Sequence, residues 1–196
     1  MKIIGITGGV GAGKSEVLDY LNEKYGATIC KADEVARKLE RKGTPCFDDI
    51  VDHFGEEIVD EKGELDRDKL SEIVFSNSEE LKILNKIVHP AVKEEVLKQI
   101  VREQRRNTNL FIIEAAVLIE DHYEEICDEM WYLYAEDATR RSRLYYSRGY
   151  NERKIDDIFA SQLPKETYME HCDRVIDNTG SFEETTEQLD SIIRDL

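Results

Sequence analysis

The chain contains 196 residues, which suits one domain or one domain with modest insertions. Its 43 Asp and Glu residues outnumber its 27 Lys and Arg residues, which gives a formal net charge of −16. Such a chain repels polyanions, so this charge excludes a general nucleic-acid partner and argues against an anionic membrane surface as a partner. Any phosphate that the protein binds must therefore be held by a local arrangement of groups.

Targeting and redox features are absent from the sequence. The longest apolar runs, such as residues 110–113, fall far short of the roughly 20 residues that span a bilayer, so we predict no transmembrane segment. The first apolar run stops at Gly8 and is too short for a signal peptide, which predicts that the mature chain begins as written and has a cytoplasmic location. No CxxC pair occurs, so we expect ordinary thiols rather than a disulfide framework or a zinc site at Cys30, Cys46, Cys127 and Cys172.

The N-terminal region predicts a βαβ unit. Residues 2–7 are apolar and mostly β-branched, glycines crowd residues 8–13, and apolar residues recur at helical spacing from Lys14 onwards. This order predicts a strand, a loop and a helix. A second strand is expected over residues 27–30, followed by a helix over residues 33–41 that Gly43 and Pro45 end.

The remaining segments extend this pattern to an α/β fold. Residues 46–106 show apolar stripes at helical spacing and no convincing strand, which predicts a helical insertion. Three further strands are expected over residues 110–113, 131–135 and 174–176. Residues 139–162 are rich in Arg and Tyr and predict a pair of helices at the carboxyl edge of the sheet. Five strands alternating with helices indicate a parallel sheet that is covered on both faces.

The motif from Gly8 to Ser15 carries the chemistry, because it matches the P-loop pattern Gly-x₄-Gly-Lys-Ser between a strand and a helix. In a P-loop, backbone N–H groups and a helix N-terminus surround phosphate oxygens. We expect Lys14 to reach the β and γ phosphates and the Ser15 hydroxyl to ligate Mg²⁺. A glycine-rich turn without a ligand is the alternative, which the order and spacing disfavour. The predicted ATP contacts are Gly9, Val10, Gly11, Ala12, Gly13, Lys14, Ser15 and Glu16.

A P-loop alone does not separate kinases from GTPases or motors. Asn85-Lys86 is similar to the start of the guanine-reading Asn-Lys-x-Asp, but the acceptor position holds Val88 and the segment is predicted to lie in the middle of a helix. The chain is also short for a motor. The arginine-rich residues 139–162 are typical of the lid of a small phosphotransferase, so we predict a small-molecule kinase.

Further segments accompany the P-loop, each weak alone but specific in this order and at these separations. Together with residues 6–15 they resemble the dephospho-coenzyme A kinases over nearly the whole chain. This resemblance implies a three-layer P-loop fold, with a nucleotide-binding core (1–32, 107–138 and 163–196), a mainly helical substrate-binding region (33–106) and a lid (139–162). The segments are Ala32-Asp33-Glu34-Val35-Ala36-Arg37, His53-Phe54-Gly55, Leu65-Asp66-Arg67, His89-Pro90, Gln162 and Val175-Ile176-Asp177-Asn178-Thr179-Gly180.

The resemblance implies a specific reaction, the ATP-dependent phosphorylation of the ribose 3′-hydroxyl of dephospho-coenzyme A. This is the last step of coenzyme A biosynthesis, and it implies ATP and Mg²⁺, with no nucleic-acid or membrane partner; we expect a monomer. Two competing interpretations are another small-molecule P-loop kinase and a catalytically silent nucleotide-binding protein. The joint presence of Lys14, Ser15, Asp33 and the lid arginines argues against lost catalysis.

Asp33 is the residue that the resemblance assigns to catalysis. An alcohol is a poor nucleophile at neutral pH, so a carboxylate that accepts its proton is the expected device. Asp33 follows the second predicted strand, at the sheet edge where ligands of parallel sheets bind. The family often has a second Asp where this chain has Lys31, so only Asp33 is carried over. The alternative is that Asp33 only caps the following helix.

Other residues are assigned to substrate binding. Arg37 lies one helical turn after Asp33, where it either binds a substrate phosphate or pairs with Asp33. The resemblance also implies substrate contacts from Thr7 and from His89, which together with Pro90 is expected to begin a long helix. For His89 the alternative is helix capping.

The lid arginines and one acidic residue complete the predicted site. We expect Arg143 to contact the transferring phosphoryl group, with Arg140 and Arg148 as further lid arginines. A solvated basic face is the alternative. The family commonly spaces two lid arginines four residues apart, whereas Arg143 and Arg148 are five apart, which puts the role of Arg148 in doubt. Glu114 ends the third predicted strand and either supports Mg²⁺ through water or has a structural role.

Overall fold

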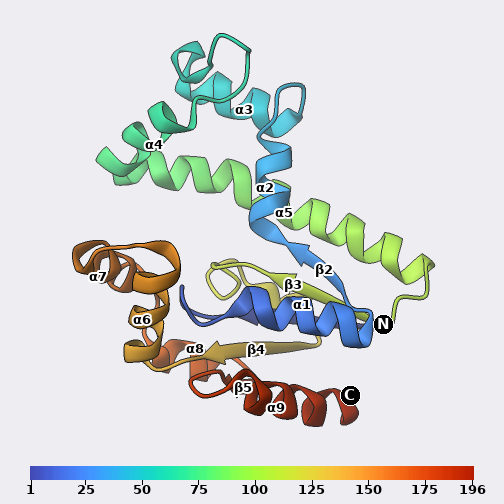
Figure 1. Ribbon diagram of the computed structural model, residues 1–196. Coiled ribbons are helices and arrows are strands. Elements are labelled where there is room, and N and C mark those ends of the chain that lie inside the picture. Colours follow the sequence, from blue (N-terminus) through green and yellow to red (C-terminus); the bar gives the residue numbers. More distant parts are fainter. The chain divides into compact units, whose positions relative to one another are not determined.

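The sheet of the computed structural model, which describes residues 1–196, has five parallel strands (Figure 1). The strand order is β2-β3-β1-β4-β5, so β1 lies at the centre. Ile6 of β1 is in register with Glu114 of β3 on one side and with Trp131 of β4 on the other. The predicted α/β class and the parallel sheet are therefore confirmed. The strands are β1 (Lys2–Thr7), β2 (Thr28–Lys31), β3 (Leu110–Glu114), β4 (Glu129–Tyr134) and β5 (Arg174–Asp177).

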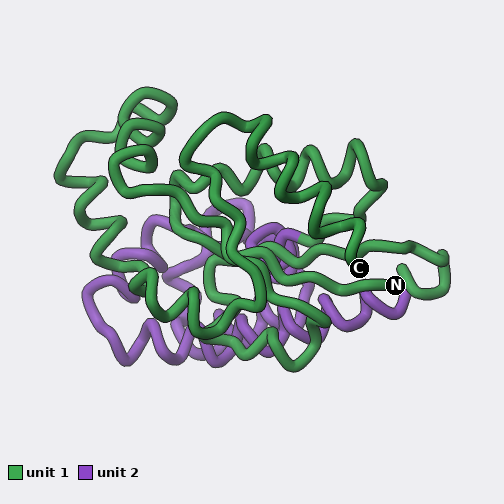
Figure 2. Tube along the Cα trace, turned by 90° about the horizontal axis from the view of Figure 1, so that it is seen from below, with its two compact units in different colours: residues 1–30, 103–196 green, residues 31–102 purple.

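The chain divides into two compact units (Figure 2). The core unit comprises residues 1–30 and 103–196, and the helical unit comprises residues 31–102. No helix is both long enough and apolar enough to cross a bilayer. The helices are α1 (Lys14–Tyr25), α2 (Ala32–Leu39), α3 (Pro45–Phe54), α4 (Arg67–Ser76), α5 (Ser78–Arg105), α6 (Asp137–Arg148), α7 (Glu152–Ala160), α8 (Lys165–His171) and α9 (Phe182–Arg194), with short 3₁₀ turns η1 (Glu56–Ile58) and η2 (Tyr123–Glu125).

Side chains from the two faces of the sheet build the layers of the core unit. Ile4, Ile6 and Trp131 point to one face, where they form a buried cluster with side chains of α1 and α9. On the opposite face, a Cβ added at Gly5 would lie 2.5 Å from the Met130 sulfur, so a larger residue there requires the Met130 side chain to move. Also on that face, Tyr132 stacks on Tyr168 of α8, with ring centroids 4.7 Å apart.

A polar network joins α9 to α1 at the edge of this core. The Asp190 carboxylate accepts hydrogen bonds from Tyr20 and Tyr25 and lies 2.6 Å from the Lys24 ammonium. These donors stabilise the ionised carboxylate, and hydrogen bonding to Lys24 is the largest of the causes that lower the pKa of Asp190 to about 2. The C-terminal helix is therefore attached to the helix of the P-loop by polar as well as apolar contacts.

The helical unit begins with α2 and contains two departures from the predictions. Helix α2 ends at Leu39, two residues before the predicted end. Pro45 does not end a helix but starts α3. The Thr44 hydroxyl caps α3 by accepting a hydrogen bond from Phe47 N at 3.2 Å. Proline suits the first turn of a helix because its missing N–H has no partner there. The only β-pairing inside residues 46–106 is an isolated bridge between Val59 and Leu65, and the predicted helical character of this segment is confirmed.

Helix α5 runs without interruption from Ser78 to Arg105, and Pro90 lies inside it. The prediction that His89-Pro90 begins a long helix is therefore wrong, as is the capping alternative for His89. The physical reason is that an apolar stripe continues through the proline: Val88, Val92 and Val96 are buried at four-residue spacing. The same helix contains Asn85 and Lys86, in agreement with the prediction that they lie mid-helix.

Substitution of two neighbouring residues of β5 tests which face of this strand belongs to the core. Ile176 is fully buried in the α1–α9 cluster, whereas its neighbour Val175 is 41% exposed on the other face. We expect Ile176→Ala to lower the free energy of unfolding by about 2–5 kcal/mol, because it removes buried methyl groups and leaves a cavity. Val175→Ala should lower it by less than about 1 kcal/mol. Urea denaturation of both variants measures the difference, and equal losses would contradict the assignment of faces.

Candidate active site

The P-loop connects β1 to α1 and presents backbone amides at the start of the helix. Gly11 and Gly13 have φ angles of 86° and 96°, which lie in the left-handed region that side-chain-bearing residues rarely adopt. Gly13 occupies the N-cap position of α1, and no side chain caps this helix. The first N–H groups of α1 are therefore available to an anion, as the P-loop interpretation requires.

A cavity of about 470 Å³ opens beside this loop. It brings together seven of the eight predicted ATP contacts, all except Ala12, with Glu114 of β3 and two of the lid arginines. Its polar lining and its position at a helix N-terminus suit a chain of phosphates. The lining residues are Gly9, Val10, Gly11, Gly13, Lys14, Ser15, Glu16, Glu114, Arg143, Leu144, Ser147 and Arg148.

Lys14 and Glu114 face each other in this cavity. The Lys14 ammonium donates a hydrogen bond to Gly8 O at 2.6 Å and lies 3.9 Å from the Glu114 carboxylate. Both side chains are about one-sixth exposed, at 16% and 17%. The parallel pairing of β1 with β3 places Glu114 here, because Glu114 is in register with Ile6, the penultimate residue of β1, two residues before Gly8. A carboxylate at this position is chemically suited to hold a water molecule on a divalent cation.

Arg143 extends from α6 to the P-loop. Its guanidinium donates hydrogen bonds to Gly11 O and Ala12 O at 3.4 and 3.3 Å, and to Asn178 O at 2.8 Å. A guanidinium has five N–H donors, so donors remain for a phosphate oxygen. Arg148, five residues later, is exposed and lines the same cavity.

Asn178 is a site residue to which the sequence analysis assigned no role. It follows β5, is 1% exposed, and donates from its side chain to Ala12 O at 2.7 Å. Its own side-chain oxygen accepts a hydrogen bond from the buried Thr185 hydroxyl of α9 at 2.8 Å. A Cβ at Gly13 would lie only 2.2 Å from the Asn178 amide nitrogen, so the loop and this side chain are closely packed. Asn178 lies in the segment 175–180 that contributes to the family resemblance, but no pattern in the sequence indicated its contact with the P-loop.

Arg140 binds protein groups instead of lining the cavity. Its guanidinium donates to Val10 O at 3.1 Å and to the side chain of Gln162, pairs with Asp137 at 3.1 Å, and lies over the Phe159 ring, 4.1 Å from its centroid. Gln162, which had no assigned chemical role, therefore anchors Arg140. Arg140 joins the P-loop to the segment that follows α7.

The lining of this cavity does not include the remaining predicted residues. Asp33 is exposed in the first turn of α2, but the N-cap of that helix is Lys31 and no side chain caps it, so the capping alternative for Asp33 is wrong. Arg37 is exposed one turn later and forms no ion pair with Asp33. His89 is half-buried in α5. Thr7 is fully buried, and its hydroxyl has no hydrogen-bond partner.

Comparison with known proteins gives the family. The family model for dephospho-CoA kinase matches residues 2–184. Curated dephospho-CoA kinases of Carboxydothermus hydrogenoformans and Enterococcus faecalis are 36% and 38% identical, over 99% and 96% of this chain and 94% of each relative. The enzyme of Aquifex aeolicus is 36% identical over 100% of this chain and 98% of its own length.

Solved structures agree with this result. A protein from Thermus thermophilus is 28% identical and superposes with a TM-score of 0.82, covering 100% of this chain and 97% of its own. A shikimate kinase from Acinetobacter baumannii, with 17% identity and a TM-score of 0.53 over 100% of this chain and 94% of its own, shares the fold alone. From the family match and the curated relatives, we conclude that the chain belongs to the dephospho-CoA kinase family.

Proposed function

We infer that this protein transfers the γ-phosphoryl group of ATP to the ribose 3′-hydroxyl of dephospho-coenzyme A. The observation that carries this inference is the cavity at the P-loop, where Lys14, Glu114 and Arg143 converge in a chain of the dephospho-CoA kinase family. A monomeric state and a cytoplasmic location remain predictions.

The core unit supplies the nucleotide site. The N–H groups at the start of α1 and the Lys14 ammonium bind the phosphates, and Arg143 offsets the negative charge that moves toward the leaving group. Ser15 is exposed at the cavity, and its hydroxyl and, through a water molecule, the Glu114 carboxylate would hold Mg²⁺. Magnesium, when bound, supplies further positive charge beside the phosphate oxygens.

The helical unit supplies the base. Asp33 accepts the proton of the 3′-hydroxyl as that oxygen forms its bond to the γ-phosphorus, and the bond from the γ-phosphorus to the bridging oxygen of ADP breaks. The exposure of Asp33 suits this task because the carboxylate is accessible to an acceptor hydroxyl. Asp33 also makes no capping bond that would engage its oxygens.

A screen of alcohol acceptors with MgATP tests the substrate directly. We expect product formation with dephospho-coenzyme A and none with shikimate, although a shikimate kinase shares the fold. Phosphorylation of a different small alcohol at a higher kcat/KM would contradict the proposed acceptor and favour another small-molecule kinase.

Lys14→Ala tests the nucleotide site. We expect this change to abolish turnover, because the ammonium serves the phosphates. The melting temperature should change only modestly, because Lys14 makes polar contacts at the cavity, in the first turn of α1, and is not part of the apolar core. Initial rates with MgATP and dephospho-coenzyme A, measured beside a melting curve, check both statements. A rate like that of the unmodified protein would refute the P-loop assignment.

Asp33→Asn tests the base. Because the amide keeps the size of the carboxylate but cannot accept the proton, phosphorylation should slow by about 10²–10⁴-fold, with ATP affinity unchanged. Single-turnover rates at saturating MgATP and acceptor measure this effect. Glu34→Gln, at the adjacent exposed acid of the same helical turn, is the matched control and should keep its rate. A loss below about threefold in Asp33→Asn would remove Asp33 from catalysis.

Arg143→Ala and Arg148→Ala separate the two arginines of the cavity. We expect Arg143→Ala to lower kcat by about 10²-fold or more, because a charge beside the transferring group is lost. It should also lower the melting temperature, since three backbone carbonyls lose a donor. Arg148→Ala, which removes an exposed side chain, should change kcat far less. The reverse order of the two effects on kcat would assign the phosphoryl contact to Arg148.

A further inference from the structure

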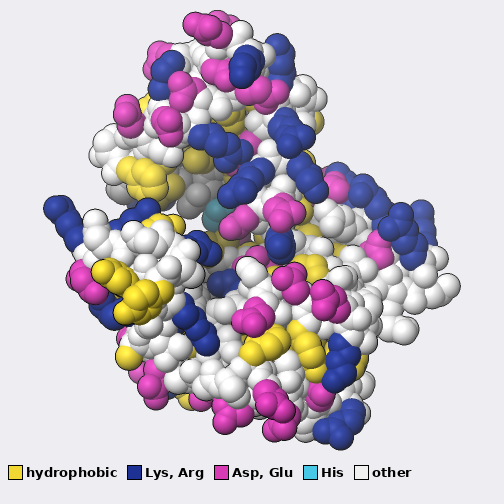
Figure 3. Space-filling view, in the orientation of Figure 1, with side chains coloured by type: hydrophobic (Ala, Val, Ile, Leu, Met, Phe, Trp, Pro, Cys, Tyr) yellow, Lys and Arg dark blue, Asp and Glu magenta, His cyan; other side chains and the backbone are white.

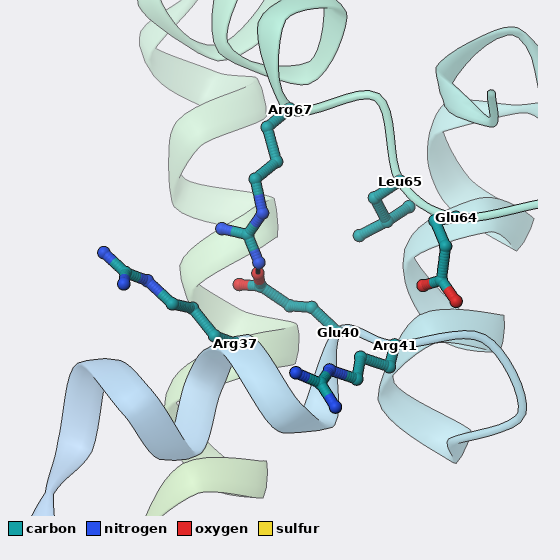
Figure 4. A pocket seen from close by; sticks show the side chains of 6 residues that line it. All are labelled: Arg37, Glu40, Arg41, Glu64, Leu65 and Arg67. Carbon is teal, nitrogen blue, oxygen red and sulfur yellow. Dashed lines mark hydrogen bonds and ion pairs between the residues drawn. The ribbon is translucent and has the colours of Figure 1, made fainter.

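A second cavity, of about 560 Å³, lies wholly within the helical unit. Its lining is dominated by charged side chains from α2, from the turn that follows α2, and from the start of α4 (Figure 4). The lining residues are Arg37, Glu40, Arg41, Glu64, Leu65 and Arg67. Three guanidinium groups thus border one cavity of a chain whose net charge is −16.

The guanidinium groups differ in their partners. Arg67 is paired with Glu40 at 2.6 Å, and this carboxylate is only 16% exposed. Arg37 and Arg41 flank that pair, and neither forms an ion pair (Figure 4). Glu64, the other acid of the lining, accepts a hydrogen bond from Lys42 N at 3.2 Å. The lining therefore has three guanidinium groups against two carboxylates, and two of the guanidinium groups have no ion-pair partner. Planar donor groups of this kind suit a phosphate or diphosphate.

The surface around α2 has the same character. Figure 3 shows Lys and Arg side chains gathered over this part of the helical unit. An anionic ligand that approaches α2 therefore meets local attraction in spite of the repulsion that the net charge exerts.

The spacing along α2 relates this cavity to the proposed base. Asp33 and Arg37 are four residues apart, about one helical turn or 6 Å of rise, and Arg41 is four residues farther on. In dephospho-coenzyme A, the reacting 3′-hydroxyl and the 5′-diphosphate are separated only by the ribose ring and one methylene group. An adenosine whose 3′-hydroxyl reaches Asp33 therefore brings its diphosphate toward Arg37, one turn farther along α2, and toward Arg41, just beyond the end of that helix.

We propose that Arg37 and Arg41 bind the 5′-diphosphate of dephospho-coenzyme A in this cavity, with Arg67, held by Glu40, as a third donor. This inference rests on the proposed function and names the contacts that select its acceptor. The diphosphate lies away from the reacting oxygen, so its binding energy positions the ribose 3′-hydroxyl at Asp33 without entering the chemistry.

The combined variant Arg37→Gln/Arg41→Gln tests the proposal, with Lys38→Gln as the matched control. Lys38 is an exposed cation of the same helix outside the cavity lining. Initial rates at saturating MgATP are compared for dephospho-coenzyme A and for adenosine, which has the 3′-hydroxyl but no diphosphate. We expect the KM for dephospho-coenzyme A to rise by about 10- to 100-fold or more in the combined variant, as befits the loss of charge-assisted hydrogen bonds. The kcat/KM for adenosine and the KM for MgATP should change by less than about threefold.

Each other outcome has a definite meaning. An unchanged KM for dephospho-coenzyme A, an equal loss with both acceptors, or an equal effect of Lys38→Gln overturns the proposal while the kinase activity stands. Inactivity of the unmodified protein toward dephospho-coenzyme A overturns the proposed function instead. In that case, calorimetry of dephospho-coenzyme A binding to the unmodified protein and to the combined variant tests separately whether the cavity binds this ligand. Should the combined variant not fold, Arg41→Gln alone replaces it, since Arg41 is exposed beyond the end of α2.

Discussion

The orientation of the peptide groups in the P-loop is the constraint on which the rest of the structure depends. An acidic chain binds a triphosphate only if local N–H groups point at it, and each peptide plane that turns its N–H inward turns a neighbouring carbonyl outward. Those carbonyls need donors. Val10 O accepts from Arg140, Gly11 O from Arg143, and Ala12 O from both Arg143 and Asn178.

These donors explain why elements distant in sequence surround the loop. Arg140 and Arg143 lie on α6, and Asn178 follows β5 and is fixed by Thr185 of α9. The network that joins Asp190 to α1 attaches the same helix α9 a second time. A loop built from glycines has high conformational entropy when free, so such donors hold the one conformation that binds phosphate. Two arginines of the predicted lid thus also support the loop itself.

The sequence predicted the helices and strands whose apolar residues recur periodically, and it predicted the P-loop, whose residues are contiguous. Contacts between segments that are distant in sequence were not predictable. The strand, loop and helix around Lys14 follow from spacing alone, and Glu114 was correctly placed at the end of a strand. The partners of Asn178 and Gln162 depend on how β5 and the end of α7 pack, which no local pattern records. The helix start predicted at His89-Pro90 was wrong. A proline normally marks the boundary of a helix, but here the apolar stripe through Val88 and Val92 continues the helix past Pro90.

Arg140 and Arg143 of the core unit differ in their contacts from Arg37 and Arg41 of the helical unit. In the core unit, Arg140 and Arg143 donate to backbone carbonyls, so they stabilise the phosphate site before any ligand arrives. In the helical unit, Arg37 and Arg41 have no ion-pair partner, although acidic residues are abundant in the chain. Unpaired cations beside a cavity contribute little to folding, so their value lies in binding an anion. A preformed site suits ATP, and guanidinium groups without ion-pair partners suit an acceptor whose diphosphate can accept their hydrogen bonds.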